Sequence, residues 1–173
     1  MRDWLPFLTA AGLAAGLASC GAGGGGSAST PAPVAAASPA VIPAIPLTTL
    51  AGDHTEVTRV TQGRAALVSL WATWCDGCER EMDELNRVDA REAPGEAVVI
   101  GIAVGEDREK VADFVRRRGL RYVQLVDEDF AFADAVGERR VPATLVIGRD
   151  GRIVFRGGAL DAKSLAALRQ ASE

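Results

Sequence analysis

The chain has little that could hold a metal or a haem: one histidine and three cysteines among 173 residues. A structural zinc site usually takes four cysteine or histidine ligands. The single histidine, His54, is distant in sequence from Cys20, and the other two cysteines, Cys75 and Cys78, form only half of such a site. Glu79 follows Cys78 where a c-type haem attachment motif has histidine. We therefore expect no metal site and no bound cofactor.

Positive charge is also scarce, with 19 lysine and arginine residues against 23 acidic residues and a net charge of −4. Proteins that bind nucleic acids usually carry a basic patch on one face. The one basic run here, residues 116–118, falls at the end of a predicted helix, where the helix dipole favours cations and solvent surrounds them. We therefore expect no nucleic acid among the partners.

No apolar run is long enough to cross a bilayer, which takes about 20 residues in a helix. The uncharged, mostly apolar residues 4–18 follow Arg2 and are typical of the central region of an export signal. This run ends in Leu17-Ala-Ser-Cys20, which resembles the lipobox of bacterial lipoproteins. We predict a signal peptide over residues 1–19 and lipidation of Cys20. The alternative is an ordinary secretory signal that is cut elsewhere, with Cys20 incidental.

Residues 21–44 consist mainly of Gly, Ala, Ser, Thr and Pro and carry no charge. Such a segment cannot bury enough apolar surface to offset the entropy of ordering, so we predict a disordered tether over residues 20–44, including the lipidated Cys20. Residues 45–173 are enough for one hydrophobic core of ordinary size. We expect one folded domain, held at the membrane by lipid and monomeric.

Two cysteines three positions apart, Cys75 and Cys78, lie in the segment Trp71-Ala-Thr-Trp-Cys-Asp-Gly-Cys78. An apolar run over residues 65–70 precedes this segment, and a helical pattern follows it to about residue 92. A C-x-x-C pair between a strand and a helix is typical of thioredoxin-like redox chemistry, although the pair could also form an inert structural disulfide. Apolar residues then recur with helical spacing at Cys78, Met82, Leu85 and Val88.

This spacing turns Cys78 inward and leaves Cys75 at the helix start. The unpaired N–H groups and the positive end of the helix dipole favour a thiolate there. We therefore predict that Cys75 attacks the partner disulfide and that Cys78 resolves the mixed disulfide. Trp71 and Trp74 flank the site, and Trp74 is a candidate contact for the substrate.

The sequence WATWCDGCERE, residues 71–81, resembles the active-site segment of the TlpA/ResA-like branch of the thioredoxin superfamily, membrane-tethered thiol–disulfide oxidoreductases of bacteria. Three further stretches support the resemblance: IPLTTLAGDHTEVTRV at residues 45–60, AVGED at 103–107 and VPATLVIGRDGRIV at 141–154. Gly77 stands where the family usually has proline, which adds backbone freedom between the two sulfurs.

Strand and helix patterns alternate along the rest of the domain. They predict an α/β fold, an α/β/α sandwich with a mixed central sheet, which the resemblance makes thioredoxin-like with an added N-terminal β-hairpin. The predicted strands are residues 45–50, 56–60, 65–70, 97–104, 122–126, 143–147 and 152–156. The first predicted helix follows the cysteine segment and ends at about residue 92. Three further helices are predicted over residues 107–118, 130–136 and 160–171.

Two carboxylates are candidates for tuning the thiols. Glu81 borders the buried stripe of the helix one turn beyond Cys78, and by resemblance it matches the acidic residue that the family carries three positions after its second cysteine. Glu106 follows the strand over residues 97–104, whose carboxyl end should lie at the same sheet edge as Cys75. The alternative for Glu106 is an acid that only complements a helix start, and for Glu81 a solvated helix residue.

Pro142 opens a predicted strand, and the resemblance implies a cis proline that faces the disulfide. Because proline has no N–H, the carbonyl of Val141 would remain free to pair with a substrate strand that passes Cys75. Val141 and Pro142 are therefore predicted to contact the substrate.

These observations predict an extracytoplasmic, membrane-anchored thiol–disulfide oxidoreductase that reduces disulfides of partner proteins through the Cys75–Cys78 pair. The reducing direction is what the resemblance implies, with cytochrome c maturation as one candidate pathway. Two other functions remain open. A copper-handling module could use the two thiols, although no downstream histidine would complete its site. In a thiol peroxidase, Thr or Ser usually stands three positions before the reactive cysteine, where this chain has Ala72.

Overall fold

The computed structural model describes residues 41–92 and 95–173. The predicted signal peptide, Cys20 and most of the predicted tether therefore lie outside the described residues. The chain already packs against the domain at its first described residues. The side chain of Ile42 is 5% exposed, and its N–H donates to the carbonyl of Gly151 at 2.8 Å. The structured part thus includes residues that the sequence analysis assigned to the tether.

Seven strands form one mixed sheet in the order β2-β1-β5-β4-β3-β6-β7. The three central strands β5, β4 and β3 are parallel, while β1 and β6 pair antiparallel to β5 and β3 on either side. The bounds are β1 Leu47–Thr49, β2 His54–Thr55, β3 Ala65–Trp71, β4 Ala97–Val104, β5 Val123–Asp127, β6 Ala143–Ile147 and β7 Ile153–Gly157.

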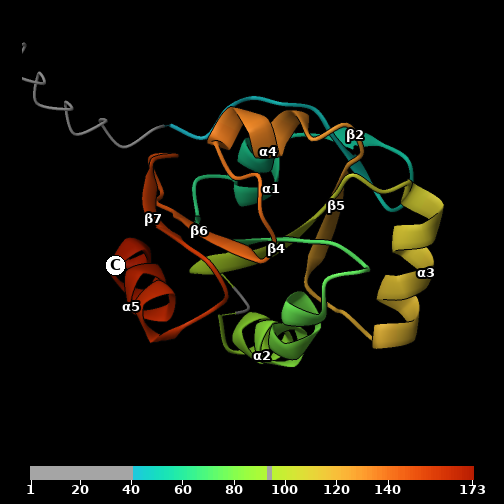
Figure 1. Cartoon of the computed structure of the whole chain (residues 1–173). Helices are drawn as coiled ribbons and strands as arrows, with labels where there is room; N and C mark the ends of the chain where they lie inside the picture. The colour runs from blue at the N-terminus through green and yellow to red at the C-terminus, as the bar shows by residue number, and fades with distance from the viewer. Residues whose placement is uncertain (1–40, 93–94) are drawn as a thin grey trace, which may run out of the picture. The chain divides into compact units, whose positions relative to one another are not determined.

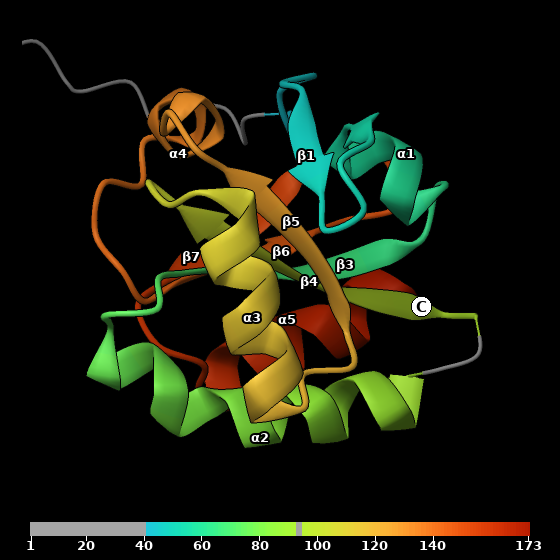
Figure 2. The same cartoon turned by 90° about the vertical axis from the view of Figure 1, so that its right-hand side faces the viewer.

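Five helices cover the two faces of the sheet (Figures 1 and 2). The core on one face contains side chains from α2, α3 and α5, and the core on the other face contains side chains from α1 and α4. The bounds are α1 Val57–Thr61, α2 Asp76–Glu92, α3 Arg108–Arg118, α4 Ala131–Val136 and α5 Ala162–Ser172. None of the helices in the described part of the chain is long and apolar enough to span a bilayer.

Strand β4 shows why the sheet needs helices on both faces. All of its residues are buried, and alternate side chains belong to opposite cores: Val99 and Ala103 pack with α2 and α3, while Ile100 and Ile102 pack with α1 and α4. Successive side chains of a strand point to opposite faces, so a continuous apolar run requires cover on both sides. The predicted α/β/α sandwich with a mixed sheet is confirmed.

The N-terminal hairpin is confirmed in part. Strands β1 and β2 pair antiparallel, but β2 contains only His54 and Thr55. Residues 56–60, predicted as the second strand, instead form most of helix α1, and that prediction is wrong. Val57 and Thr61 are buried one helical turn apart, while Arg59 between them is exposed. A helix permits this pattern, whereas an alternating strand would place all three side chains on the same face. His54, which lies between the two predicted strands, belongs to β2.

Helix α3 begins and ends as the sequence predicts. The side chain of Asp107 accepts a hydrogen bond from the backbone N–H of Lys110 at 2.8 Å. Gly119 ends the helix in the left-handed conformation, with φ of 63°, which glycine adopts at little cost. This helix lies next to the loop after β4, so its start positions Glu106 and Asp107 at the carboxyl edge of the sheet.

Candidate active site

The two cysteines lie where strand β3 leads into helix α2. Strand β3 ends at Trp71, and α2 begins at Asp76. Cys75 and Cys78 form a disulfide, with their Cα atoms 5.3 Å apart. The buried face of α2 contains Cys78, Met82, Leu85 and Val88, as the helical spacing predicts, and also Glu81. Packing this face against the sheet therefore places the cysteine pair at the carboxyl edge of the parallel strands.

The two sulfurs have different surroundings. The side chain of Cys78 is fully buried, whereas that of Cys75 is 7% exposed. The backbone N–H of Cys78 donates to Sγ of Cys75 at 3.1 Å. After reduction, this N–H and the positive end of the α2 dipole would favour the thiolate form of Cys75. Cys75 is thus the sulfur that is better placed to react with a partner at the surface.

Trp71 fixes the end of β3 that leads to the cysteines. Its indole N–H donates to Oε1 of Gln124 at 3.2 Å, and its ring packs against the ring of Phe114 with centroids 5.3 Å apart. Gly101 makes room for this contact, because a Cβ there would lie 2.5 Å from Oε1 of Gln124. The active-site turn therefore starts from a rigid, buried point.

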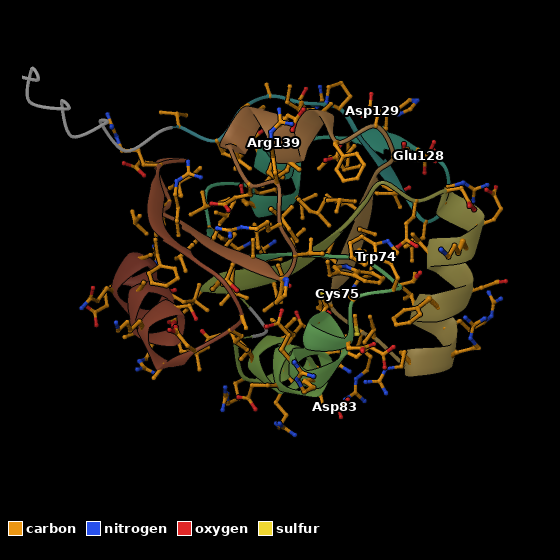
Figure 3. All side chains as sticks on the ribbon, viewed as in Figure 1. Trp74, Cys75, Asp83, Glu128, Asp129 and Arg139 are labelled. Atoms are coloured by element: carbon orange, nitrogen blue, oxygen red, sulfur yellow. A yellow bond between two sulfur atoms is a disulfide. The ribbon has the colours of Figure 1, made fainter. Side chains whose placement is uncertain are left out.

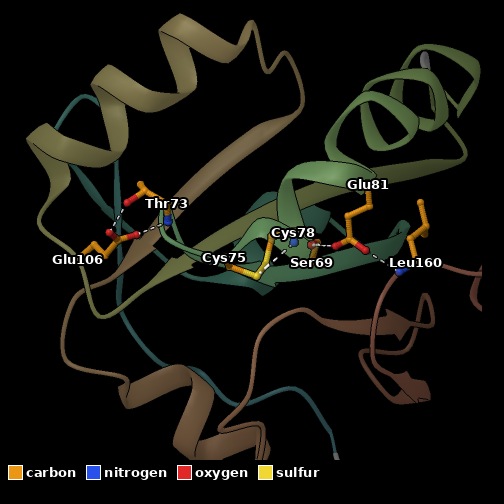
Figure 4. The surroundings of a disulfide bond; sticks show 7 residues. All are labelled: Ser69, Thr73, Cys75, Cys78, Glu81, Glu106 and Leu160. Atoms are coloured by element: carbon orange, nitrogen blue, oxygen red, sulfur yellow. Dashed lines mark hydrogen bonds between the residues drawn. A yellow bond between two sulfur atoms is a disulfide. The ribbon is translucent and has the colours of Figure 1, made fainter.

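Glu81 is a buried carboxylate on the Cys78 side of the disulfide (Figure 4). Its Oε1 accepts a hydrogen bond from the hydroxyl of Ser69 on β3 at 3.1 Å, and its Oε2 accepts one from the backbone N–H of Leu160 at 2.7 Å. Burial raises the pKa of Glu81, and the hydrogen bonds from Leu160 and Ser69 offset only part of that increase. The carboxylate can therefore take up a proton closer to neutral pH than an ordinary glutamate.

Glu106 lies on the opposite side of the site, beyond Cys75, where it contacts Thr73 (Figure 4). Its two oxygens accept hydrogen bonds from the backbone N–H of Thr73 at 2.6 Å and from the Thr73 hydroxyl at 2.5 Å. Nζ of Lys110 forms an ion pair with Oε1 at 2.6 Å. Burial alone would raise the pKa of Glu106, but the contacts from Lys110 and Thr73 together lower it. Glu106 is thus an ionised anchor for the turn that carries Cys75.

Pro142 packs against the first turn of α2. The Val141–Pro142 peptide bond is cis. A Cβ on Gly77 would lie 3.2 Å from Cδ of Pro142, so the proline ring lies close against the backbone between the two cysteines. Gly77 is the second residue of helix α2. Glycine at the position where the family usually has proline therefore does not interrupt the start of the helix. In residues 41–92 and 95–173, Val141 takes no part in the backbone hydrogen bonds of turns and loops.

Trp74 lies beside Cys75 on the open face between α2 and α4 (Figure 3). Its side chain is 64% exposed, which is unusual for so large an apolar group. Together with Val141 and Pro142, it borders the surface that a partner must approach to reach the Cys75 sulfur.

Three contacts of the carboxylates were not predicted from the sequence: Ser69, Thr73 and the backbone of Leu160. Ser69 could have been noticed as the only polar residue in β3. The contact from the Leu160 N–H could not have been predicted, because Leu160 is 79 residues from Glu81 and no local sequence pattern indicates the contact.

A parallel strand, a helix that begins at a C-x-x-C disulfide and a cis proline packed against the backbone between the two cysteines define a thioredoxin-like protein with a dithiol/disulfide site. A family model described as Redoxin matches residues 32–164, and the chain belongs to this family.

Curated relatives support the same grouping. The thiol–disulfide oxidoreductase ResA of Halalkalibacterium halodurans is 31% identical over 105 residues, which cover 61% of this chain and 59% of that protein. The thiol:disulfide interchange protein DsbE of Escherichia coli is 30% identical over 106 residues, which cover 61% of this chain and 55% of that protein. The chain thus spans less than two thirds of either relative. The resemblance to ResA-like proteins is confirmed.

Solved structures confirm the thioredoxin-like fold. A thiol:disulfide interchange protein of the thioredoxin family from Chlorobium tepidum superposes with a TM-score of 0.66 at 22% identity, covering 79% of this chain and 99% of that one. The protein dsbF of Mycobacterium tuberculosis superposes with a TM-score of 0.65 at 22% identity, covering 75% of this chain and 96% of that one.

Replacing Glu81 with glutamine should change the chemistry of both thiols. An ionised carboxylate disfavours a second negative charge nearby, so Glu81→Gln should lower the apparent thiol pKa values by about one unit. The carboxylate is also a candidate proton acceptor for Cys78, so its loss should lengthen the lifetime of a mixed disulfide roughly tenfold, while the initial attack slows less. A pH series of alkylation rates and of mixed-disulfide lifetimes measures both effects.

Glu84→Gln is the matched control, because Glu84 lies on the same helix but pairs with Arg87 at the surface, at 2.7 Å. This variant should behave like the wild type. Superimposable curves for the wild type and Glu81→Gln would place Glu81 outside the mechanism.

Proposed function

We propose that this protein is a thiol–disulfide oxidoreductase that reduces disulfides of partner proteins through Cys75 and Cys78. The observation that carries the proposal is the asymmetry of the pair: Cys75 keeps an exposed fraction of 7% and its Sγ accepts an N–H hydrogen bond at 3.1 Å, while Cys78 is fully buried. Membership of the Redoxin family and the names of the relatives from Halalkalibacterium halodurans and Escherichia coli support it. The reducing direction rests on the resemblance to ResA-like proteins.

The reaction has two exchange steps. The Cys75 thiolate attacks one sulfur of the partner disulfide, which forms a mixed disulfide and releases the other partner sulfur as a thiolate that takes up a proton. The Cys78 thiol then loses its proton and attacks Sγ of Cys75, which breaks the mixed disulfide and releases the second partner thiol. Two electrons and two protons pass from the dithiol to the partner, and the protein is left with the disulfide present in this structure.

Residues around the disulfide have three further proposed roles: proton transfer, positioning of Cys75 and contact with the substrate. Glu81 is the proposed proton acceptor for Cys78, because it lies on the Cys78 side of the disulfide and burial raises its pKa. Glu106 holds the turn through Thr73 and so acts on Cys75 as a positioning residue. Val141 offers unpaired backbone to a substrate strand, and Trp74 and Pro142 border the approach to Cys75. A dithiol reductant must return the disulfide to the reduced state after each cycle.

We further propose that the protein works outside the cytoplasm, anchored to a bacterial membrane by lipid on Cys20. The support is the sequence of residues 4–20, an apolar run that ends in a lipobox-like motif. Several acyl chains on one residue hold a protein at a membrane stably, whereas a single chain does so only marginally. Cysteine pairs of apocytochromes c are candidate substrates, since cytochrome c maturation is the pathway that the family resemblance suggests.

The roles of the two cysteines can be separated by trapping. Cys78→Ser removes the resolving thiol, so mixed disulfides between Cys75 and partner proteins should accumulate in cells. Cys75→Ser removes the attacking thiol and should trap few partners or none. Non-reducing electrophoresis followed by mass spectrometry measures both variants. Equal trapping by the two variants would contradict the assigned roles.

The anchor can be tested through Cys20. If Cys20 carries lipid, Cys20→Ser should appear in the soluble fraction or remain as the unprocessed precursor, because the acyl chains supply the membrane affinity. Membrane fractionation and the mass of the mature protein measure the outcome. Ser27→Ala, a change in the predicted tether, should remain in the membrane fraction. Normal signal cleavage together with unchanged membrane partitioning of Cys20→Ser would overturn the lipoprotein proposal.

A further inference from the structure

A hollow of about 310 Å³ lies beside the disulfide, between Trp74 and the segment that leads to Pro142. Its apolar walls are Trp74, Val104, Phe130 and Val141, and Arg139 and Arg140 line it as well. Trp74 and Phe130 are 64% and 42% exposed, so two of the most exposed large apolar side chains in the described part of the chain face one hollow. We call this hollow the Trp74 groove.

The ring of Phe130 is held at the groove by an unusual local backbone. Phe130 has a φ of 63°, in the left-handed region that bulky residues rarely adopt. The ring lies over Gly105, where a Cβ would come within 2.1 Å of the Phe130 ring. Strained backbone of this kind is concentrated at functional sites, and here it keeps an aromatic side chain partly exposed instead of burying it.

The groove also carries local positive charge in a chain that is acidic overall. Within residues 41–92 and 95–173, Arg140 forms no ion pair, and Arg139 pairs with Asp134 at 3.3 Å through a side chain that is 78% exposed. Glu138 also lines the groove, but its charge is paired with Arg156 at 3.6 Å. Arg140 additionally lines a second hollow on the far side of the segment, next to Pro142.

Two acidic residues precede Phe130 in the sequence but do not line the groove. Glu128 and Asp129 are exposed immediately before Phe130, away from Arg139 (Figure 3). The charge at the Pro142 side of the groove is therefore positive, and it is available to a carboxylate that lies close to the disulfide.

We infer that the Trp74 groove selects the partner disulfide: it takes an extended segment with a large apolar side chain next to the reacting cysteine and a carboxylate that pairs with Arg140. This inference rests on the proposed function, because the segment must reach Cys75 to react. Apolar contact with Trp74 and Phe130 positions the segment, and the charge of Arg140 discriminates against basic partners. Val141 lines the groove and takes no part in the backbone hydrogen bonds of turns and loops in the described residues, so an extended segment can pair with its backbone while a side chain enters the groove.

The test uses three synthetic peptides, each with one cysteine linked to glutathione as a mixed disulfide. The first has leucine next to the cysteine and glutamate two positions away on both sides, the second has lysine in place of glutamate, and the third has glycine in place of leucine. The reduced protein should act on the first peptide about fivefold faster than on the second, since an exposed ion pair is worth a few tenths to about 1 kcal/mol. The measured quantity is the ratio of kcat/KM values, in which general changes in thiol reactivity cancel.

Two variants test the charge of Arg140 and the apolar contact of Phe130 separately, and a third variant is the control. Arg140→Glu should reverse the preference between the glutamate and lysine peptides. Phe130→Asn, in which asparagine tolerates the left-handed backbone, should reduce the preference for leucine over glycine. Arg117→Glu makes the same charge change on an exposed residue of α3, away from the groove, and should leave both ratios at the wild-type values.

A wild-type ratio near one, or the same charge preference in the wild type and Arg140→Glu, would overturn the inference about the groove. Glutathione disulfide alone, which has no large apolar side chain next to its cysteines, checks the chemistry separately. If the wild type reduces glutathione disulfide but does not discriminate among the peptides, the oxidoreductase proposal stands and the groove proposal fails. If it reduces none of these disulfides, the oxidoreductase proposal fails, and the groove proposal with it.

Discussion

The geometry of the active site depends on how helix α2 packs against the sheet. Its buried face, which includes Cys78, Met82 and Leu85, packs in the core between α2 and the parallel strands. Burying each such side chain contributes about 1.5–3 kcal/mol, so the rotation of the helix about its axis is strongly fixed. This rotation buries Cys78 completely and leaves Cys75, immediately before the helix, as the more accessible of the two cysteines. The helix dipole and the N–H of Cys78 then act on Cys75 because it lies at the first turn.

The same geometry gives the two carboxylates different tasks. Glu81 shares the buried face with Cys78, so desolvation raises its pKa and makes it suited to exchange a proton. Glu106 lies at the end of the neighbouring strand, where Lys110 and Thr73 lower its pKa and keep it charged. One carboxylate is therefore placed to move a proton, and the other to hold a turn in place. Glu106 lies on the Cys75 side because β3 and β4 are parallel and bring their carboxyl ends to one edge of the sheet, and Glu81 lies on the Cys78 side because both residues belong to the buried face of α2.

The sequence predicts the parts of this arrangement that follow from local patterns. The continuous apolar run of β4 predicts a strand that is buried on both faces. The helical spacing of apolar residues in α2 predicts a helix that is buried on one face. Residues 56–60 mislead because β-branched residues in a short segment favour a strand, whereas tertiary burial of Val57 makes this segment a helix. Contacts across long separations leave no such pattern in the sequence. The Leu160 N–H on Glu81 and the ring of Phe130 beside Trp74 become visible only in three dimensions.

The central claim is that the seating of α2 makes Cys75 the reactive thiol and keeps Cys78 covered. The most direct measurement is to reduce the wild-type protein fully, modify it with limiting iodoacetamide across a pH series, and map the modified cysteine by mass spectrometry. The first modification should fall on Cys75, with an apparent pKa below the value of about 8.5 for a free cysteine, while Cys78 remains unmodified. Modification of both cysteines at comparable rates, or of Cys78 first, would contradict the claim.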